Sequence, residues 1–485
     1  MLIRVPYLWQ IPRFTDELQE GLWALAIYRG EIRPLTAVDS YYGPLWSYLL
    51  AGVFHLGGPT ELLPRLVAML LAALGVVLTY LVGRDMAGRS AGLIAAALML
   101  TSAGHVVINS HTARSNSITP LITTLIVWTL YRAVRSGNGW YLAIAGLLFG
   151  LALQTHLSVV VFVPGLAVGL LLMRPRLLVS RWVPLSAALF ALGYANMIVF
   201  NLQSGFWSFV HARALQSGYA DGRSTSLSIY LENFDALIQS LSRLLSGNID
   251  TAESLARFPY VALALIGLVV LARRGNPLPL AFCLSGVLLF PYFNPRYGPI
   301  LSGRYLIPLL PFAYLGIGLA LAWLAEQLRT RRLVVPRAAQ AAVVLALVLA
   351  PLVHLGLYYR EVIEDERVNE PLFTLVDTLR SARQAGELVL LDEGLGQENL
   401  TAGGTDLKAL RFLLEASAIP YQVAKLTSAG VEPIMADAPN ILTIMDVKKT
   451  ESLGRKLTLT PYGGAVESAS GSSHRYRVYR LSPRP

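Results

Sequence analysis

Two adjacent carboxylates near the start of the chain, Asp16 and Glu17, are the residues whose chemistry stands out first. Three leucines at helical spacing follow them and predict an amphipathic helix with Glu20 off its apolar stripe: Leu18, Leu22 and Leu25. Adjacent residues on a helix point in different directions, so the two carboxylates are expected to differ in task. One could act as a general base or help to hold a divalent metal ion. The simpler interpretation is that Thr15 caps the helix and both carboxylates favour its dipole.

The composition indicates an integral membrane protein. Of 485 residues, 54% are hydrophobic and only 14% are charged, whereas a soluble protein carries about 25% charged residues. The net charge of +10 does not indicate nucleic-acid binding, because the excess of arginine is confined to the part before residue 360. All five lysines lie after that point, in a stretch of soluble composition. The single cysteine, Cys283, excludes an internal disulfide.

Apolar runs predict an all-α membrane bundle of about ten spans. The spans are expected near 61–83, 91–109, 118–134, 140–155, 157–173, 182–201, 258–272, 277–293, 304–325 and 338–357. Arginines fill every second connection, so the positive-inside rule makes those connections cytoplasmic. The remaining segments are then extracytoplasmic: 1–60, 109–117, 202–257, 294–303 and 360–485. A further helix ahead of residue 1 is expected, because ten spans would leave both ends outside.

This topology predicts three regions. Residues 1–60 form a first extracytoplasmic loop with amphipathic interfacial helices, 61–359 form the transmembrane bundle, and 360–485 form a small extracytoplasmic α/β domain. Within the bundle region, the outer loop 202–257 is expected to contain a helix at 226–246. In the last region, helices are predicted near 370–385 and 405–417. Strands are predicted at 387–392, 421–423, 441–445 and 476–481.

Polar side chains gather at the outer ends of the spans rather than at their centres. The group includes His111, Arg114, His156, Arg296 and Arg304, while the predicted spans contain no Asp, Glu or Lys in their interiors. This absence disfavours an ion-coupled transporter, which needs ionisable groups at mid-membrane. Arginines on the outer side oppose the positive-inside bias, which suggests an anionic partner such as a phosphate.

Each of these residues also has a structural interpretation. The arginine side chains could extend to lipid head groups, and His111 could be a hydrogen-bonded interfacial histidine. Tyr42, with Tyr41 and Trp46, is most simply part of an aromatic belt at the membrane interface. Stacking on a sugar is the alternative for Tyr42.

Taken in order, several short motifs resemble those of a known family. They are Asp16-Glu17, Gly43-Pro44-Leu45-x-x-Tyr48, Pro64-Arg65-Leu66, Ser110-His111-x-Ala113-Arg114 and Ser302-Gly303-Arg304-Tyr305-Leu306-x-Pro308-Leu309-Leu310-Pro311. Over about residues 10–325 the chain resembles the GT-C superfamily of polytopic glycosyltransferases. Within it, the protein O-mannosyltransferases and lipid A aminoarabinose transferases are most similar.

The resemblance implies transfer of a sugar from a polyprenyl phosphate to an acceptor hydroxyl on the extracytoplasmic side, with inversion. The acceptor would be a protein, a lipid or a polysaccharide. Asp16 matches the position of the base, and Arg304, with Arg296 or Arg114, would stabilise the leaving phosphate. Substrate-binding positions also fall on Glu17, Tyr42, His111, Asn116 and Tyr305. Many relatives carry a second carboxylate where this chain has Asn116, a weaker metal ligand, so no divalent metal is expected to be required.

Two other classes of function remain open from the residues alone. One is a lipid-linked glycan transporter or flippase, which would move its substrate without forming a glycosidic bond. The other is a non-catalytic membrane protein whose outer domain binds cell-envelope glycan. The enzyme hypothesis differs from both in predicting that Asp16, His111, Arg114 and Arg304 converge on one outer cleft.

Overall fold

The computed structural model describes residues 2–6, 8, 15–219, 226–247, 258–293, 303–332, 336–364, 371–393, 406–438, 440–467 and 475–484. The chain forms two compact units. The first, here called the bundle unit, comprises Met1–Pro6, Arg33–Trp46 and Arg65–Tyr359. The second, here called the sheet unit, comprises Tyr7–Ile32, Ser47–Pro64 and Arg360–Pro485. The first 60 residues are therefore shared between the two units.

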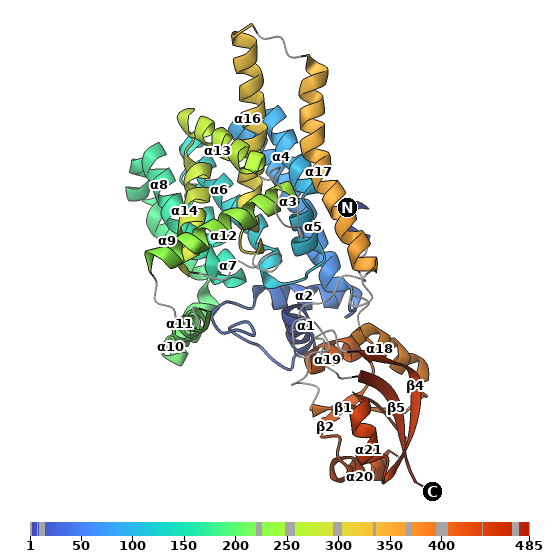
Figure 1. The fold of residues 1–485 in the computed structure, drawn as a ribbon. Coiled ribbons are helices and arrows are strands. Elements are labelled where there is room, and N and C mark those ends of the chain that lie inside the picture. Colours follow the sequence, from blue (N-terminus) through green and yellow to red (C-terminus); the bar gives the residue numbers. More distant parts are fainter. Residues whose placement is uncertain are drawn as a thin grey trace. The chain divides into compact units, whose positions relative to one another are not determined.

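The bundle unit is helical (Figure 1). Its α-helices, some of which extend slightly beyond the unit, are α3 (Leu63–Ala87), α4 (Arg89–Thr101), α5 (Ala103–Ser110), α6 (Thr119–Ser136), α7 (Trp140–Thr155), α8 (Val163–Met173), α9 (Trp182–Gly193), α10 (Ala195–Ser204), α11 (Trp207–Tyr219), α12 (Leu227–Ser246), α13 (Phe258–Arg273), α14 (Leu278–Phe293), α16 (Leu310–Thr330) and α17 (Arg337–Glu364). Short 3₁₀ helices connect them: η1 (Leu2–Arg4), η2 (Ser115–Ser117), η3 (Leu157–Phe162), η4 (Pro175–Val179) and η6 (Ile307–Leu309).

A helix or a bent helix pair occupies each of the ten predicted span positions, and α12 matches the helix predicted at 226–246. Among the described residues, four helices are long and apolar enough to cross a membrane. The number rises to six if the pairs α4–α5 and α9–α10, bent by 60° and 70°, each make one span. The other apolar helices at these positions are shorter. The chain is an integral membrane protein, whereas the count of ten spans stays a prediction.

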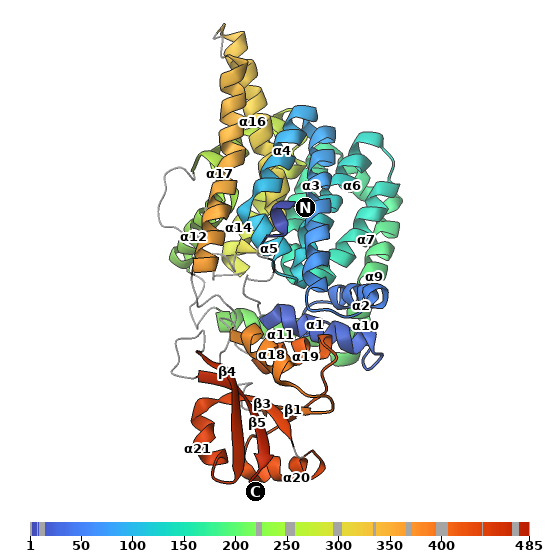
Figure 2. The ribbon, with the colours of Figure 1, turned by 90° about the vertical axis from the view of Figure 1, so that its right-hand side faces the viewer.

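Close approach of backbones holds the helices together. A Cβ atom added to Gly267 of α13 would lie 1.7 Å from the carbonyl oxygen of Gly316 in α16. Small residues at such crossings let helices pack tightly where lipid removes the hydrophobic driving force. The same principle applies to α7 and α9, where Gly146 faces the Ser186 carbonyl. Figure 2 shows α6 and α7 side by side, in agreement with their contacts.

The sheet unit contains a five-stranded mixed sheet with the strand order β2-β1-β3-β5-β4. Strand β1 is parallel to β2 and β3, while β5 is antiparallel to β3 and β4. The strands are β1 (Leu388–Asp392), β2 (Tyr421–Ala424), β3 (Ile441–Asp446), β4 (Leu457–Glu467) and β5 (Arg475–Pro483). The helices are α1 (Thr15–Tyr28), α2 (Leu45–Gly57, which begins in the bundle unit), α18 (Pro371–Ala382), α19 (Asp406–Ala416), α20 (Ser428–Asp437) and α21 (Thr450–Leu453), with the 3₁₀ helix η8 (Val447–Lys449).

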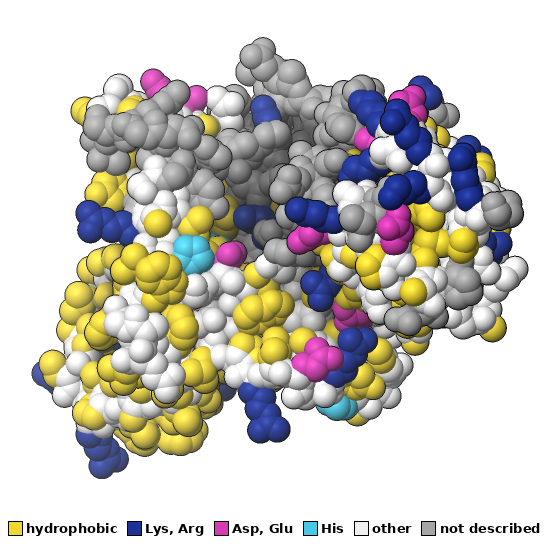
Figure 3. Space-filling model, turned by 90° about the horizontal axis from the view of Figure 1, so that it is seen from below, with side chains coloured by type: hydrophobic (Ala, Val, Ile, Leu, Met, Phe, Trp, Pro, Cys, Tyr) yellow, Lys and Arg dark blue, Asp and Glu magenta, His cyan; other side chains and the backbone are white. Residues whose placement is uncertain are grey.

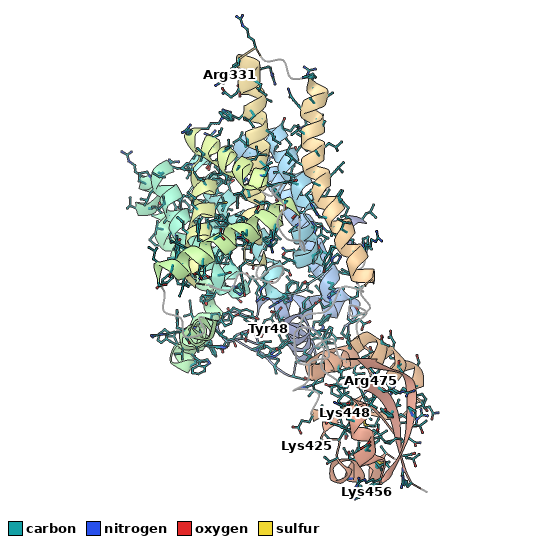
Figure 4. All side chains as sticks on the ribbon, viewed as in Figure 1. Tyr48, Arg331, Lys425, Lys448, Lys456 and Arg475 are labelled. Atoms are coloured by element: carbon teal, nitrogen blue, oxygen red, sulfur yellow. The ribbon has the colours of Figure 1, made fainter. Side chains whose placement is uncertain are left out.

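The four strands predicted from the sequence correspond to β1, β2, β3 and β5, and the two predicted helices to α18 and α19. Strand β4 and helix α20 were not predicted. One core of the unit joins α20 and α21 to the sheet, through side chains such as Leu390, Val431 and Leu453. Charged side chains of both signs gather toward the right of Figure 3. Four exposed basic residues of the unit are labelled in Figure 4: Lys425, Lys448, Lys456 and Arg475.

Helix α1, which carries Asp16 and Glu17, packs on α19 within the sheet unit. A Cβ atom on Gly21 would lie 2.7 Å from the ring of Phe412, so the absence of a side chain allows the two helices to meet. At the other end of α1, Arg29 forms an ion pair with Glu415 at 2.7 Å. The segments at the two ends of the sequence therefore fold as one body.

Candidate functional site

Several residues of the bundle unit that could take part in binding or catalysis lie around one histidine. His156 lies in the break between α7 and η3, partly buried, where its extended backbone begins the new helix. Its imidazole is surrounded by three tyrosine rings, with centroids at 5.0 Å for Tyr305, 6.0 Å for Tyr41 and 6.3 Å for Tyr42. These residues come from three segments that are far apart in the sequence, and together they form what we call the His156 cluster.

The loop 33–46 brings Tyr41 and Tyr42 to this cluster. Gly43 donates its backbone N–H to the carbonyl of Gln154 at 3.1 Å, and a Cβ on Gly43 would lie 2.7 Å from the Gln154 side chain. Any residue larger than glycine would push the loop away from α7. On its other side, the loop accepts a 2.6 Å hydrogen bond at the Ser40 carbonyl from the Ser208 hydroxyl of α11. The Gly43-Pro44 motif therefore serves to hold a tyrosine pair against the end of α7.

Arg304 and Tyr305 lie in the turn that leads into η6 and α16. The Leu306 N–H closes this turn on the Gly303 carbonyl at 2.9 Å. One guanidinium nitrogen of Arg304 donates to the Tyr305 hydroxyl at 2.6 Å, and the guanidinium carbon is 4.8 Å from the centre of that ring. The predicted pair of binding residues is thus a single unit, with the arginine oriented by its neighbour.

Arg114 approaches the cluster from the loop after α5. Its backbone N–H donates to the Ser117 hydroxyl at 3.2 Å, and its carbonyl accepts from the Ser117 N–H at 2.8 Å, which fixes the start of η2. Burial, together with the positive charges of Arg304 and Arg114, lowers the pKa of His156 to about 3. Both guanidinium groups therefore act on the same ring, and the local field there is positive.

Two further predicted residues of the second outer loop are placed differently. His111 is fully buried, with Nε2 2.9 Å from the carbonyl oxygen of Arg4 and its ring 5.8 Å from that of Tyr359. Its described contacts thus tie together three parts of the bundle unit, as a structural histidine would. Asn116 is partly exposed in η2.

Arg4 is a residue that the sequence reasoning missed. Its side chain is fully buried and donates to the Ser110 hydroxyl at 2.6 Å, with another guanidinium nitrogen 2.8 Å from Nδ1 of His105. Burial lowers the pKa of Arg4 to about 10, so the group remains charged at neutral pH. Only its position near the first residue and its charge were visible in the sequence, and neither indicated a buried partner.

The acidic residues of α1 belong to the sheet unit. Asp16 is part of α1, but its side chain lies outside the described residues, as does Arg296 altogether. Glu17 is buried, with 2% of its surface exposed. Glu20, expected on the polar side of α1, is equally buried, so that expectation was wrong. The buried face of a helix follows from its apolar stripe only when the helix has a single apolar neighbour. No group of three or more His, Cys, Asp or Glu residues that could hold a metal ion occurs in the part of the chain that the structure describes.

One family model matches part of the chain. Residues 42–199 match the model of the dolichyl-phosphate-mannose-protein mannosyltransferase family. This segment includes Tyr42, His111, Arg114, Asn116 and His156. No curated protein matches the chain by sequence.

Three solved structures share the fold at low sequence identity. ArnT from Cupriavidus metallidurans bound to undecaprenyl phosphate is 14% identical, with a TM-score of 0.63 over 99% of this chain and 96% of ArnT. The apo state of the same protein gives 13% identity and a TM-score of 0.56 over the same shares. An oligosaccharyltransferase from Archaeoglobus fulgidus gives 12% identity and a TM-score of 0.52, over 90% of this chain and 64% of that one.

Proposed function

We propose that this chain is a glycosyltransferase of the GT-C superfamily, and that it transfers a sugar from a polyprenyl-phosphate donor to an acceptor hydroxyl. The reaction takes place on the extracytoplasmic side of the membrane and inverts the anomeric centre. The acceptor is a protein, a lipid or a polysaccharide of the cell envelope. The donor lipid lies in the bilayer beside the bundle unit.

The proposed reaction needs one base and one cationic group. Asp16 takes the proton of the acceptor hydroxyl, whose oxygen then attacks the anomeric carbon. The bond between that carbon and the phosphate oxygen breaks, and the polyprenyl phosphate leaves with the electron pair. Arg304, assisted by Arg114, stabilises the negative charge on that phosphate. Glu17, next to Asp16 in α1, contributes to substrate binding. Arg296 is a further candidate for a cation that stabilises the phosphate.

A single observation carries the proposal. Two guanidinium groups act on His156, at the break between two apolar helices, and three tyrosines enclose that point. A positive field in a partly dry site is what a departing phosphate needs, because electrostatic stabilisation strengthens where water is excluded. The partly exposed ring of Tyr305 supplies a flat surface on which a sugar ring can stack.

The relatives support the nature of the donor. One solved structure with this fold contains undecaprenyl phosphate, and the matching family model describes enzymes that use dolichyl phosphate mannose. We propose that the sugar donor of this chain is likewise carried on a lipid phosphate, and we do not specify the sugar.

The test compares glycoconjugates from cells that lack the gene with those from cells given back the wild type or Asp16→Asn. Mass spectrometry should show a glycan lost on deletion, restored by the wild type and not restored by Asp16→Asn at equal protein level. Restoration by the variant would remove Asp16 from the mechanism. Movement of a lipid-linked glycan across the membrane without any new glycosidic bond would instead establish a flippase.

A further inference from the structure

The two nitrogen atoms of the His156 ring have different surroundings. Nδ1 is the acceptor for the backbone N–H of Ser158 at 3.0 Å, and the Ser158 hydroxyl lies 2.8 Å from the same atom. This contact caps the first turn of η3. Because a backbone N–H can only donate, Nδ1 carries no hydrogen, and the proton of the neutral ring resides on Nε2.

The other ring nitrogen, Nε2, has a hydrogen to donate. Among the described residues, no acceptor receives a hydrogen bond from Nε2. The ring is in contact with three tyrosine rings and within the electrostatic reach of two arginines. A donor held in a positive field, with no acceptor from the described protein, is suited to an anionic oxygen.

The His156 ring is neutral near physiological pH. Burial and the charges of Arg304 and Arg114 keep the pKa of His156 far below the physiological range. Protonation would place a hydrogen on Nδ1 and break the cap of η3. The ring therefore offers one N–H in a fixed direction, and it does not exchange protons with a substrate near neutral pH.

We propose that His156 binds a phosphate oxygen of the lipid-linked donor through its Nε2–H, while its Nδ1 holds the break between α7 and η3 in shape. This rests on the proposed function, which supplies the phosphate. Arg304 and Arg114 provide charge, and His156 provides direction, because a single N–H on a rigid ring fixes one oxygen in place. No bond is formed or broken at His156.

Two substitutions separate the tasks of the two nitrogens. The amide of asparagine reaches the position of Nδ1 and can accept from Ser158, but it does not extend to Nε2. The amide nitrogen of glutamine reaches the position of Nε2 and can donate there, but it leaves the cap acceptor out of place. His156→Asn and His156→Gln are therefore matched variants of similar polarity.

The experiment measures the affinity of the purified full-length protein for undecaprenyl phosphate, together with its thermal stability in the same detergent. We expect His156→Asn to bind about 10- to 100-fold more weakly, the usual effect of losing a hydrogen bond to a charged group. Its melting temperature should stay near that of the wild type. We expect His156→Gln to keep its affinity within a few-fold and to melt at a lower temperature.

The outcomes distinguish this inference from the proposed function. If both variants bind undecaprenyl phosphate like the wild type, or if His156→Asn binds better than His156→Gln, His156 is only a helix cap. If the wild type itself does not bind undecaprenyl phosphate, the proposed function fails and this inference fails with it. Should either variant not fold, the folded one still decides, because the predictions for the two are opposite.

Discussion

The arginines around His156 in the bundle unit and the arginines of the sheet unit have different described neighbours. In the bundle unit, Arg304 lies over the Tyr305 ring, and the charges of Arg304 and Arg114 help to lower the pKa of His156. In the sheet unit, a hydrogen bond to the Glu387 carboxylate raises the pKa of Arg480, and Arg29 is paired with Glu415. An arginine held by a carboxylate of its own chain links two elements. We propose that Arg304 and Arg114, whose charges help to lower the pKa of His156, bind an anion.

The proposed reaction uses cationic groups and an acidic group, and these belong to different units. The cationic half, which would stabilise the leaving phosphate, belongs to the bundle unit. The acidic half, on α1, folds with the C-terminal α/β elements through Gly21 and Phe412. The C-terminal elements thus hold α1, the helix that carries the proposed base Asp16.

The largest effect is expected from the cationic half. Arg304→Ala should lower the rate of sugar transfer by about 10²- to 10³-fold, the range seen when a group that stabilises developing charge is removed. The rate is measured in membranes supplied with a polyprenyl-phosphate sugar. Arg331→Ala is the matched control, because Arg331 is exposed after α16 (Figure 4) and should change the rate little. Equal transfer rates for Arg304→Ala and Arg331→Ala would show that Arg304 does not stabilise the leaving phosphate.

A second prediction concerns the acidic half. Phe412→Ala removes a buried ring between α19 and α1, and should cost the sheet unit about 3–5 kcal/mol of unfolding free energy. Transfer should fall with it, while the affinity for undecaprenyl phosphate should not change, because the His156 cluster lies in the other unit. Thermal melts and lipid binding measure the two effects. Val423→Ala, at an exposed position of β2, should alter neither. Loss of lipid affinity in Phe412→Ala would show that the two halves are not separate.

The smallest effect is a dependence of stability on pH. The folded pKa of His156 is about 3, against about 6.5 for a histidine in the unfolded chain. Between these values only the unfolded chain takes up the proton, so the free energy of unfolding falls as the pH decreases below about 6.5, by up to about 1.4 kcal/mol per pH unit. His156→Asn should therefore show a shallower decline between pH 6.5 and 4.5 in denaturant melts, and parallel curves would contradict the assignment.

Parts of this arrangement follow from local sequence and parts do not. The positions of the bundle helices follow from apolar runs, and the outward arginines Arg114 and Arg304 follow from their opposition to the charge bias. Their meeting at His156 joins segments from four regions of the chain, which no local pattern encodes. The burial of Arg4 and Glu20 depends likewise on neighbours that are distant in sequence.

The missed elements of the sheet unit have local reasons. Strand β4 contains Pro461, Gly463 and Gly464, residues that disfavour a strand. It forms nonetheless because it is an edge strand, where a missing N–H and a register shift are tolerated. Helix α20 contains Pro433, which hides its periodicity, although the Thr427 hydroxyl caps its start by accepting from the Gly430 N–H.

The central claim, that the His156 cluster recognises a lipid phosphate, is tested most directly by comparing two ligands on the purified protein. Undecaprenyl phosphate and undecaprenol differ only in the phosphate, so the ratio of their dissociation constants isolates its contribution. The account predicts at least about 100-fold tighter binding of the phosphate, reduced to a few-fold in Arg304→Ala. Equal affinity of the wild type for both lipids would contradict it.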